Sequence, residues 1–241
     1  MIGIICPSHL GTIWSRDERM ATEPYTPTDR RPIASRERPF WQKTAEILAR
    51  RGVSANGISI AGMIAALCAG ACLAATSYLG EPGRICWVIG ALGSQLRLIA
   101  NLLDGMVAIA AGRASAVGEL FNEMPDRVSD AAILIGAGYA VGGNPVAGYV
   151  AACLAIMTAY IRAVGKASGV THLFLGPMAK QHRMTVIIVA CLFMTLCPTR
   201  WLPSYHEWGV MSAALLIIIL GAIVTCVRRI GRIARVLKGN A

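Results

Sequence analysis

NLLDGMVA, residues 101–108, and GELFNEMPDRVSD, residues 118–130, place ionisable side chains inside or at the ends of long apolar runs. A charged residue near the centre of a membrane helix costs about 2.5–3.5 kcal/mol of insertion free energy. Ionisable residues in such runs are therefore functional candidates, and these two stretches hold the main ones in the chain.

Helical spacing puts the polar residues of each stretch on one face. In the first helix this face carries Arg97, Asn101 and Asp104, which are four and three residues apart. In the second helix it carries Gly118, Asn122, Asp126 and Asp130, in steps of four. Carboxylate and amide oxygens bind hard divalent ions such as Mg²⁺. Water and substrate phosphates usually complete the coordination shell of the ion. The spacing therefore predicts two oxygen-rich stripes around a metal ion and a phosphorylated ligand, beside the bare surfaces of Gly105, Ala108 and Gly118.

These residues resemble the signature of the CDP-alcohol phosphatidyltransferases, D-x2-D-G-x2-A-R-x8-G-x3-D-x3-D, and match its register without a gap. The matching positions are Asn101, Asp104, Gly105, Ala108, Ile109, Gly118, Asn122 and Asp126. Five of these eight agree in residue type. Residues 52–59 (GVSANGIS) also resemble the V/T-x-N-x-I-T stretch that precedes the signature in the family.

Three signature positions depart from the family. Asn101 and Asn122 stand where the family has aspartates, and Ile109 stands where it has arginine. In the family, four carboxylates balance two divalent ions, so the two neutral amides predict one ion or weaker metal binding. Asp130, one turn beyond the signature, and Arg113 are candidates to replace the missing charges.

The resemblance implies transfer of a phosphatidyl group from a CDP-linked lipid, expected to be CDP-diacylglycerol, to an alcohol with release of CMP. It assigns one or two ions of Mg²⁺ or Mn²⁺ to Asp104, Asp126, Asn101, Asn122 and Asp130. It places the CDP group beside Asp104, Gly105, Ala108 and Gly118. Asp126 is the expected general base, with Glu123 and Asp130 as alternates. The acceptor is left open among glycerol phosphate, inositol phosphate, serine, choline and other alcohols.

Basic residues near the two stretches are candidates for binding phosphate or the acceptor. They are Arg97, Arg113, Arg162, Lys180 and Arg183. Lys180 and Arg183 share a helical face in GPMAKQHR, residues 176–183, which resembles a basic segment of some family members. From the residues alone, a cytoplasmic membrane anchor that binds no ligand explains these cations equally well.

Composition predicts an integral membrane protein. The 241 residues are 55% hydrophobic and 15% charged, with a mean hydropathy of +0.56. The basic residues behind the net charge of +10 lie at the edges of apolar runs, which favours anionic lipid over nucleic acid as their partner. Eight cysteines without a C-x-x-C pair are expected to be small packing residues.

Six apolar runs are long enough to cross a bilayer, which requires about 20 residues of helix. They cover residues 57–77, 85–111, 119–141, 145–165, 184–201 and 208–227. Residues 1–38 are expected to be a disordered extension, in which Met20 offers an alternative start, and residues 39–52 an interfacial amphipathic helix. The predicted fold is an all-α six-helix membrane bundle over residues 53–230, with a basic cytoplasmic tail over residues 231–241.

Charge and small residues also predict orientation and assembly. Basic residues gather on one side of the predicted helices, which places both termini and the acidic stripes on the cytoplasmic side of a bacterial inner membrane. Frequent Gly and Ala permit close helix packing and predict a homodimer.

Two alternatives to an active transferase stay open at this stage. Neutral amides at two signature positions suit a catalytically weakened homologue that binds CDP-lipid or is a partner subunit of another lipid enzyme. Asp104, Asp126 and Arg97 could also form a buried ion-pair network that only locks the bundle.

Overall fold

The computed structural model describes residues 34–79, 83–113, 116–170, 173–197 and 208–239, and its elements there are all helices. They are η1 (Ala34–Glu37), α2 (Pro39–Arg50), α3 (Ala55–Leu79), α4 (Arg84–Ala110), α5 (Ala116–Tyr139), α6 (Pro145–Ala167), α7 (Lys180–Leu196) and α8 (Val210–Leu237). The predicted all-α class is confirmed for this part of the chain.

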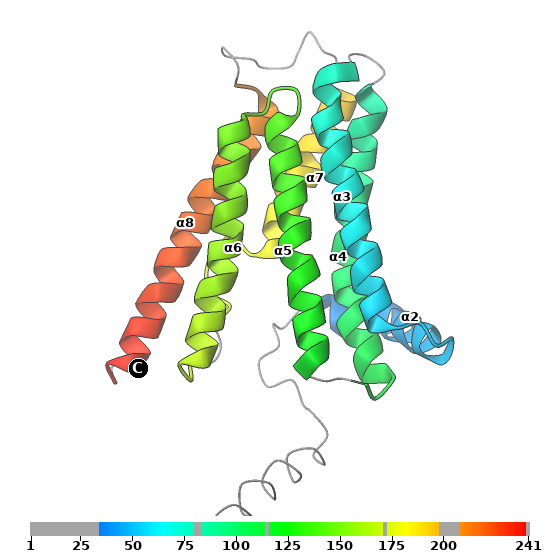
Figure 1. Cartoon of the computed structure of the whole chain (residues 1–241), viewed down its shortest axis with the longest axis vertical. Coiled ribbons are helices and arrows are strands. Elements are labelled where there is room, and N and C mark those ends of the chain that lie inside the picture. Colours follow the sequence, from blue (N-terminus) through cyan, green and yellow to red (C-terminus); the bar gives the residue numbers. More distant parts are fainter. Residues whose placement is uncertain (1–33, 80–82, 114–115, 171–172, 198–207, 240–241) are drawn as a thin grey trace, which may run out of the picture.

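The six long helices, α3 to α8, pack as a closed ring (Figure 1). α3 lies between α4 and α5; α5 then packs on α6, α6 on α8, α8 on α7, and α7 returns to α4. α4 and α5 pack against each other much less than either packs against α3. The first turns of α5, the last turns of α4, helix α2 and the end of α8 all lie at the lower end of the bundle in Figure 1.

Small residues let α3 approach both of its neighbours at backbone distance. A Cβ added to Gly136 of α5 would lie 2.2 Å from the carbonyl oxygen of Gly70 in α3. On the other side, a Cβ added to Gly62 would lie 2.6 Å from the Cβ of Ala100 in α4. Helices in lipid associate through such close packing, because lipid tails are as apolar as the side chains. Helix α3 therefore sets the separation of α4 and α5, the two helices that carry the polar stripes.

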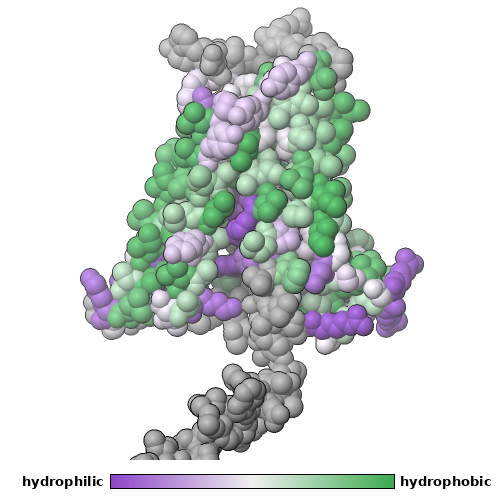
Figure 2. Space-filling view, viewed as in Figure 1, coloured by the Kyte–Doolittle hydropathy of each residue, from purple (hydrophilic) through white to green (hydrophobic). Residues whose placement is uncertain are grey.

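Four of the described helices are long and apolar enough to cross a membrane, namely α3, α4, α6 and α8. Figure 2 shows hydrophobic residues over the sides of the bundle and strongly hydrophilic ones gathered toward its lower end. Helix α5 carries several charged residues in its first half, and α7 has only 17 residues. A multi-pass membrane protein is thus supported, and all six predicted runs fall on helices, although residues 198–201 of the fifth run lie outside the described part.

The predicted amphipathic helix over residues 39–52 is present as α2. Pro39 stands at its first position, where a missing N–H costs nothing. Ala45 is buried and packs with Leu103 and Val107 of α4. The extension predicted over residues 1–38 lies outside the described residues up to residue 33, and Ala34–Glu37 form a 3₁₀ turn. At the other end, the basic tail predicted over residues 231–241 is helical as far as Leu237.

We predict that Gly136→Ala lowers the free energy of unfolding by about 1–3 kcal/mol, because the added methyl group forces α3 and α5 apart. Unfolding of the purified protein in detergent measures the change. Gly231→Ala on α8 is the control, since nothing lies within 4 Å of its added Cβ. Equal stability of the two variants would contradict the close contact of α3 with α5.

Candidate active site

Asp126 lies at the centre of the polar cluster, where α4, α5 and α7 meet. Its side chain is 11% exposed, and both carboxylate oxygens are paired with cations. Oδ1 accepts from Nη2 of Arg97 on α4, and Oδ2 accepts from Nζ of Lys180 at the start of α7. The same ammonium donates to Oδ1 of Asn101 at 2.5 Å. The two predicted stripes therefore face each other, with a lysine from a third helix between them.

Asp104 accepts hydrogen bonds from three directions. Ser59 on α3 donates its hydroxyl to Oδ2 at 2.8 Å, and the backbone N–H of Gly105 lies 2.6 Å from Oδ1. The Asn122 amide nitrogen lies 3.4 Å from the same Oδ1. The carbonyl oxygen of Asn122 is buried and has no hydrogen-bond partner among the described residues. Buried polar atoms are rarely left unpaired, so this oxygen has capacity for a ligand.

Asp130 lies one turn beyond Asp126 and is paired with a different residue. Its Oδ2 accepts from Nη2 of Arg183 on α7 at 2.7 Å, and both side chains are almost completely buried. Arg183 also donates to the hydroxyl of Thr158 on α6 and to the carbonyl oxygen of Met178. This pair joins three helices and lies beside the Asp126 cluster; the role of Asp130 as a metal ligand stays a prediction.

A second, more exposed ionic cluster is centred on Glu123. Its Oε1 is paired with Arg162 of α6 and its Oε2 with Arg127, one turn further along α5, at 2.9 Å. The Arg162 guanidinium lies 6.0 Å from the centre of the Phe174 ring. Arg162 is therefore near the segment between α6 and α7, where the sequence predicted phosphate contacts.

Side chains of α8 fix the segment that leads into α7. Arg229 donates to the carbonyl oxygen of Leu175 at 3.1 Å and to that of Thr158 in α6 at 2.5 Å. The backbone N–H of Met178 donates to the hydroxyl of Thr225 at 3.0 Å. Gly176 adopts a φ of 112° and lies against Thr225, where a side chain would clash. These contacts set the position at which α7 begins, and hence that of Lys180.

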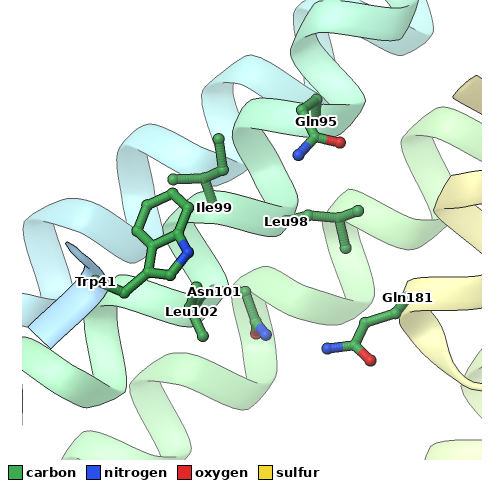
Figure 3. Close-up of a pocket in the computed structure, with 7 residues that line it drawn as sticks. All are labelled: Trp41, Gln95, Leu98, Ile99, Asn101, Leu102 and Gln181. Atoms are coloured by element: carbon green, nitrogen blue, oxygen red, sulfur yellow. The ribbon is translucent and has the colours of Figure 1, made fainter. Parts of the chain in front are cut away.

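A pocket of about 180 Å³ opens beside the Asp126 cluster, between α2, α4 and α7. It is lined by Trp41, Gln95, Leu98, Ile99, Asn101, Leu102 and Gln181. Figure 3 shows Trp41 reaching over from α2 and Gln181 pointing from α7 toward Asn101. The pocket is mostly apolar at its α4 wall and polar where it reaches the site.

The remaining predicted residues lie at the edge of the cluster. Gly105 and Ala108 on α4 and Gly118 on α5 are half-buried at the lower end of the two helices. Arg113 is exposed on the turn after α4. Its predicted role as a substitute for the arginine missing at position 109 stays a prediction.

Among the described residues, the donor atoms around Asp104 suit a divalent ion. No group of three or more His, Cys, Asp or Glu side chains in the described ranges is arranged to hold a metal ion. Asp104 nevertheless offers a carboxylate, and Asn122, whose amide nitrogen faces that carboxylate, offers an unpaired oxygen on the same side chain. Mg²⁺ is often held by one or two carboxylates, with water and substrate phosphates completing its shell. The donor set therefore fits an ion that binds together with a phosphorylated substrate.

Comparison with curated proteins finds a clear relative. The phosphatidylinositol phosphate synthase of Streptomyces avermitilis is 30% identical over 203 residues, which cover 79% of this chain and 76% of the relative. The chain belongs to the CDP-alcohol phosphatidyltransferase family. The enzyme class predicted from the signature, a phosphatidyltransferase of phospholipid synthesis, is thereby confirmed. No protein-family model matches the chain.

Solved structures of another family member share the fold. The phosphatidylinositol phosphate synthase of Mycobacterium tuberculosis with CDP-DAG bound has a TM-score of 0.64 and 18% identity, covering 81% of this chain and 94% of that one. The same enzyme in complex with manganese and citrate also has a TM-score of 0.64 and 18% identity, covering 80% and 88%. This phosphatidyltransferase thus has the helical architecture of the family.

Sequence reasoning missed several residues of the site. Ser59 lies in the stretch that resembled the family before the signature, but its hydroxyl was not assigned to Asp104. Trp41 and Gln181 line the pocket, and nothing in their spacing marked them. Lys180 was predicted to bind phosphate, whereas the structure pairs it with Asn101 and Asp126.

Because Asp130 and Arg183 are buried together, we predict that Asp130→Asn lowers the free energy of unfolding by about 3–5 kcal/mol, by leaving Arg183 without its counter-charge. Replacing both residues by leucine should recover most of this loss, since a buried ion pair and an apolar pair are similarly stable. Denaturation in detergent measures both variants.

Glu123→Gln serves as the matched control for Asp130→Asn. The Glu123 side chain is 47% exposed, so removing its charge should change the stability by at most about 1 kcal/mol. If Asp130→Asn were no more destabilising than this control, the Asp130–Arg183 pair would not contribute to stability as described.

Proposed function

We propose that this enzyme transfers a phosphatidyl group from CDP-diacylglycerol to a phosphorylated alcohol and releases CMP. The observation that carries the proposal is one cluster in which Asp104, Asn122 and Asp126, all at signature positions of the family, lie together with Lys180. A network that only locked the bundle would not require the unpaired Asn122 oxygen. The named relatives and the CDP-DAG complex support the donor lipid.

Asp126 is the proposed general base. It lies on α5 within the cluster and is held in place by Arg97 and Lys180, so its carboxylate has a fixed direction. A base in that position accepts the proton of the acceptor hydroxyl as the hydroxyl oxygen attacks the lipid-side phosphorus. CMP then leaves as the bond from that phosphorus to the CMP oxygen breaks.

We assign a divalent ion, Mg²⁺ or Mn²⁺, to Asp104 and Asn122. Asn101 and Asp126, at signature positions, and Asp130, one turn beyond the signature, are the further ligands predicted from the sequence. When bound, such an ion neutralises charge on the diphosphate during transfer. The manganese complex of the Mycobacterium tuberculosis enzyme supports a divalent ion in this family. Ser59 and the Gly105 N–H hold the Asp104 carboxylate in one orientation, which prepares it for a ligand.

The CDP-lipid is proposed to lie across the lower end of α4. The CDP group would pack on the small residues Gly105, Ala108 and Gly118, which are half-buried. The glycerol end and the start of the acyl chains would enter the pocket between α2, α4 and α7. The pocket combines Asn101 and Gln181 near the site with Leu98 and Ile99 further along α4, which suits a molecule with a polar and an apolar end.

The acceptor is proposed to be an inositol phosphate. The Streptomyces avermitilis relative is a phosphatidylinositol phosphate synthase, which supports this choice. Arg162, with Glu123 and Arg127, forms the half-exposed ionic cluster nearest to the segment between α6 and α7. The planar guanidinium of Arg162 can bind a phosphate monoester through two parallel hydrogen bonds. To do so, Arg162 would have to give up its contact with Glu123. The phosphate roles of Arg97, Arg183 and Arg113 stay predictions.

We further propose that all six long helices cross the bilayer, with the site and both termini in the cytoplasm of a bacterium. The apolar sides of the bundle and the hydrophilic lower end in Figure 2 support this orientation. Asp126 and Asp130 of α5 are buried in the ring, and the more exposed Glu123 is paired with Arg127 and Arg162, so these charges do not prevent insertion. Labelling of single cysteines placed at Arg113 and at Tyr78, from each side of the membrane, measures the orientation. Labelling of position 113 from outside the cell would show that the orientation is the opposite of the one proposed.

The homodimer predicted from the abundance of Gly and Ala stays a proposal. Exposed apolar side chains on the outer surfaces of the bundle, such as Ile64 on α3 and Leu220 on α8, are available to lipid or to a second copy. The mass of the detergent-solubilised protein, measured by light scattering, separates a dimer from a single chain.

Purified protein in detergent should release CMP from CDP-diacylglycerol only when Mg²⁺ or Mn²⁺ and an acceptor are both present. Inositol phosphate should stimulate release more than inositol, glycerol phosphate, serine or choline does. If another alcohol stimulates release more strongly, that alcohol is the acceptor, and the proposed type of reaction is unchanged. Metal-dependent binding of the CDP-lipid with no CMP release for any alcohol would instead identify a binding homologue.

Replacing Asp126 by Asn should lower the rate of CMP release by about 10²–10⁴-fold, the usual contribution of a general base. The variant should still elute as a folded protein and bind CDP-diacylglycerol. Glu46→Gln on α2 removes an exposed carboxylate and should leave the rate unchanged. Transfer at the normal rate by the Asp126→Asn protein would contradict the assignment of Asp126 as the general base.

A further inference from the structure

The side of the site formed by Asn101 and Asp126 already holds a cation. Nζ of Lys180 contacts the carbonyl oxygen of Asn101 at 2.5 Å and is paired with Oδ2 of Asp126. These two residues stand at the first and last positions of the family signature, where aspartates help to balance two divalent ions. The ammonium therefore sits between two oxygens that the signature assigns to metal.

The position of this ammonium is set by the fold. The Lys180 side chain is only 16% exposed, and its residue is the first of α7. The preceding segment is fixed by Arg229 and Thr225 of α8, and Arg183, one turn later, is paired with Asp130. The backbone of Lys180 is therefore fixed relative to α8, and its ammonium is held by the contacts with Asn101 and Asp126.

Charge at this side of the site opposes a second ion. Arg97 and Lys180 bring two positive charges to one Asp126 carboxylate, and Asn101 adds none. A divalent cation placed beside this group would meet a net positive charge at short range in a poorly hydrated environment. Arg127 on α5 lies 3.7 Å from Oδ2 of Asp126 and adds a further positive charge. An aspartate at position 101 would lower the net positive charge of this group, so the asparagine and the lysine act in the same direction.

The charge on the opposite side of the site, around Asp104, is negative. Asp104 contacts hydrogen-bond donors but no cation within salt-bridge distance among the described residues. The buried carbonyl oxygen of Asn122 beside it lacks a partner in the same part of the chain. A single hard cation there would gain a carboxylate and an amide oxygen, and substrate phosphates and water would complete its shell.

We infer that the ammonium of Lys180 takes the place of a second divalent ion in this enzyme, which holds one ion, at Asp104 and Asn122. The inference rests on the proposed function, and it assigns Lys180 to the metal position between Asn101 and Asp126 in place of a contact with the acceptor phosphate. A fixed cation there supplies one positive charge, independent of the metal concentration.

Electron paramagnetic resonance of bound Mn²⁺ tests the inference without measuring activity. Two Mn²⁺ ions about 4 Å apart, as in two-metal sites, are magnetically coupled, whereas a single ion gives an uncoupled spectrum. The full chain in detergent with Mn²⁺ and CDP-diacylglycerol should give the uncoupled spectrum, and Asp104→Asn should remove it. A coupled spectrum from the unaltered chain, or a bound ion that survives Asp104→Asn, would overturn the inference.

The double variant Asn101→Asp with Lys180→Gln should gain a second Mn²⁺ and the coupled spectrum. Lys43→Gln, which removes an exposed lysine of α2, is the control and should keep the uncoupled one. A folded double variant that still binds one ion would show that Lys180 is not what excludes the second. If the double variant does not fold, the spectrum of the unaltered chain alone decides the number of ions.

The same protein preparations separate this inference from the proposed function. CMP release together with a coupled spectrum in the unaltered chain overturns only the role of Lys180. An uncoupled spectrum that depends on Asp104, with no CMP release for any acceptor, keeps the one-ion site and overturns the transferase activity.

Discussion

The carboxylate of Asp126 is the constraint on which the rest of the site depends. A buried carboxylate requires a counter-charge or hydrogen-bond donors, and each oxygen of Asp126 is paired with a cation from a different helix. Arg97 brings α4 to it and Lys180 brings α7, although α4 and α5 pack weakly against each other. Polar contacts thus hold α4, α5 and α7 together at a place where α4 and α5 have few packing contacts with each other.

Helix α3 makes this arrangement possible from the other side. It contacts α4 and α5 through small residues, including Gly62 and Gly70, and so holds two polar helices at a set distance from each other. It also supplies Ser59, whose hydroxyl orients the carboxylate of Asp104. The packing that is typical of membrane helices and the orientation of a site ligand therefore come from one helix.

The sequence predicted the parts of the site that depend on helical period. Asn101 and Asp104, and likewise Asn122 and Asp126, could be placed on common faces because an α-helix repeats every 3.6 residues. The partner of Lys180 could not be predicted, because it lies 79 residues away in the chain and its position depends on contacts made by α8. The helical repeat shows which residues share a face of one helix, but it does not show which other helix packs against that face.

The contacts of Arg229 and Thr225 with the segment before α7 have a consequence for how the enzyme matures. Both residues lie on α8, the last helix of the bundle to be synthesised. Until that helix has been inserted, the segment before α7 lacks these contacts, and the start of α7 is held only by its contacts with α4, α5 and α6. A nascent chain that has inserted α3 to α7 but not α8 therefore holds both signature stripes in the membrane without the contacts that set the segment before α7.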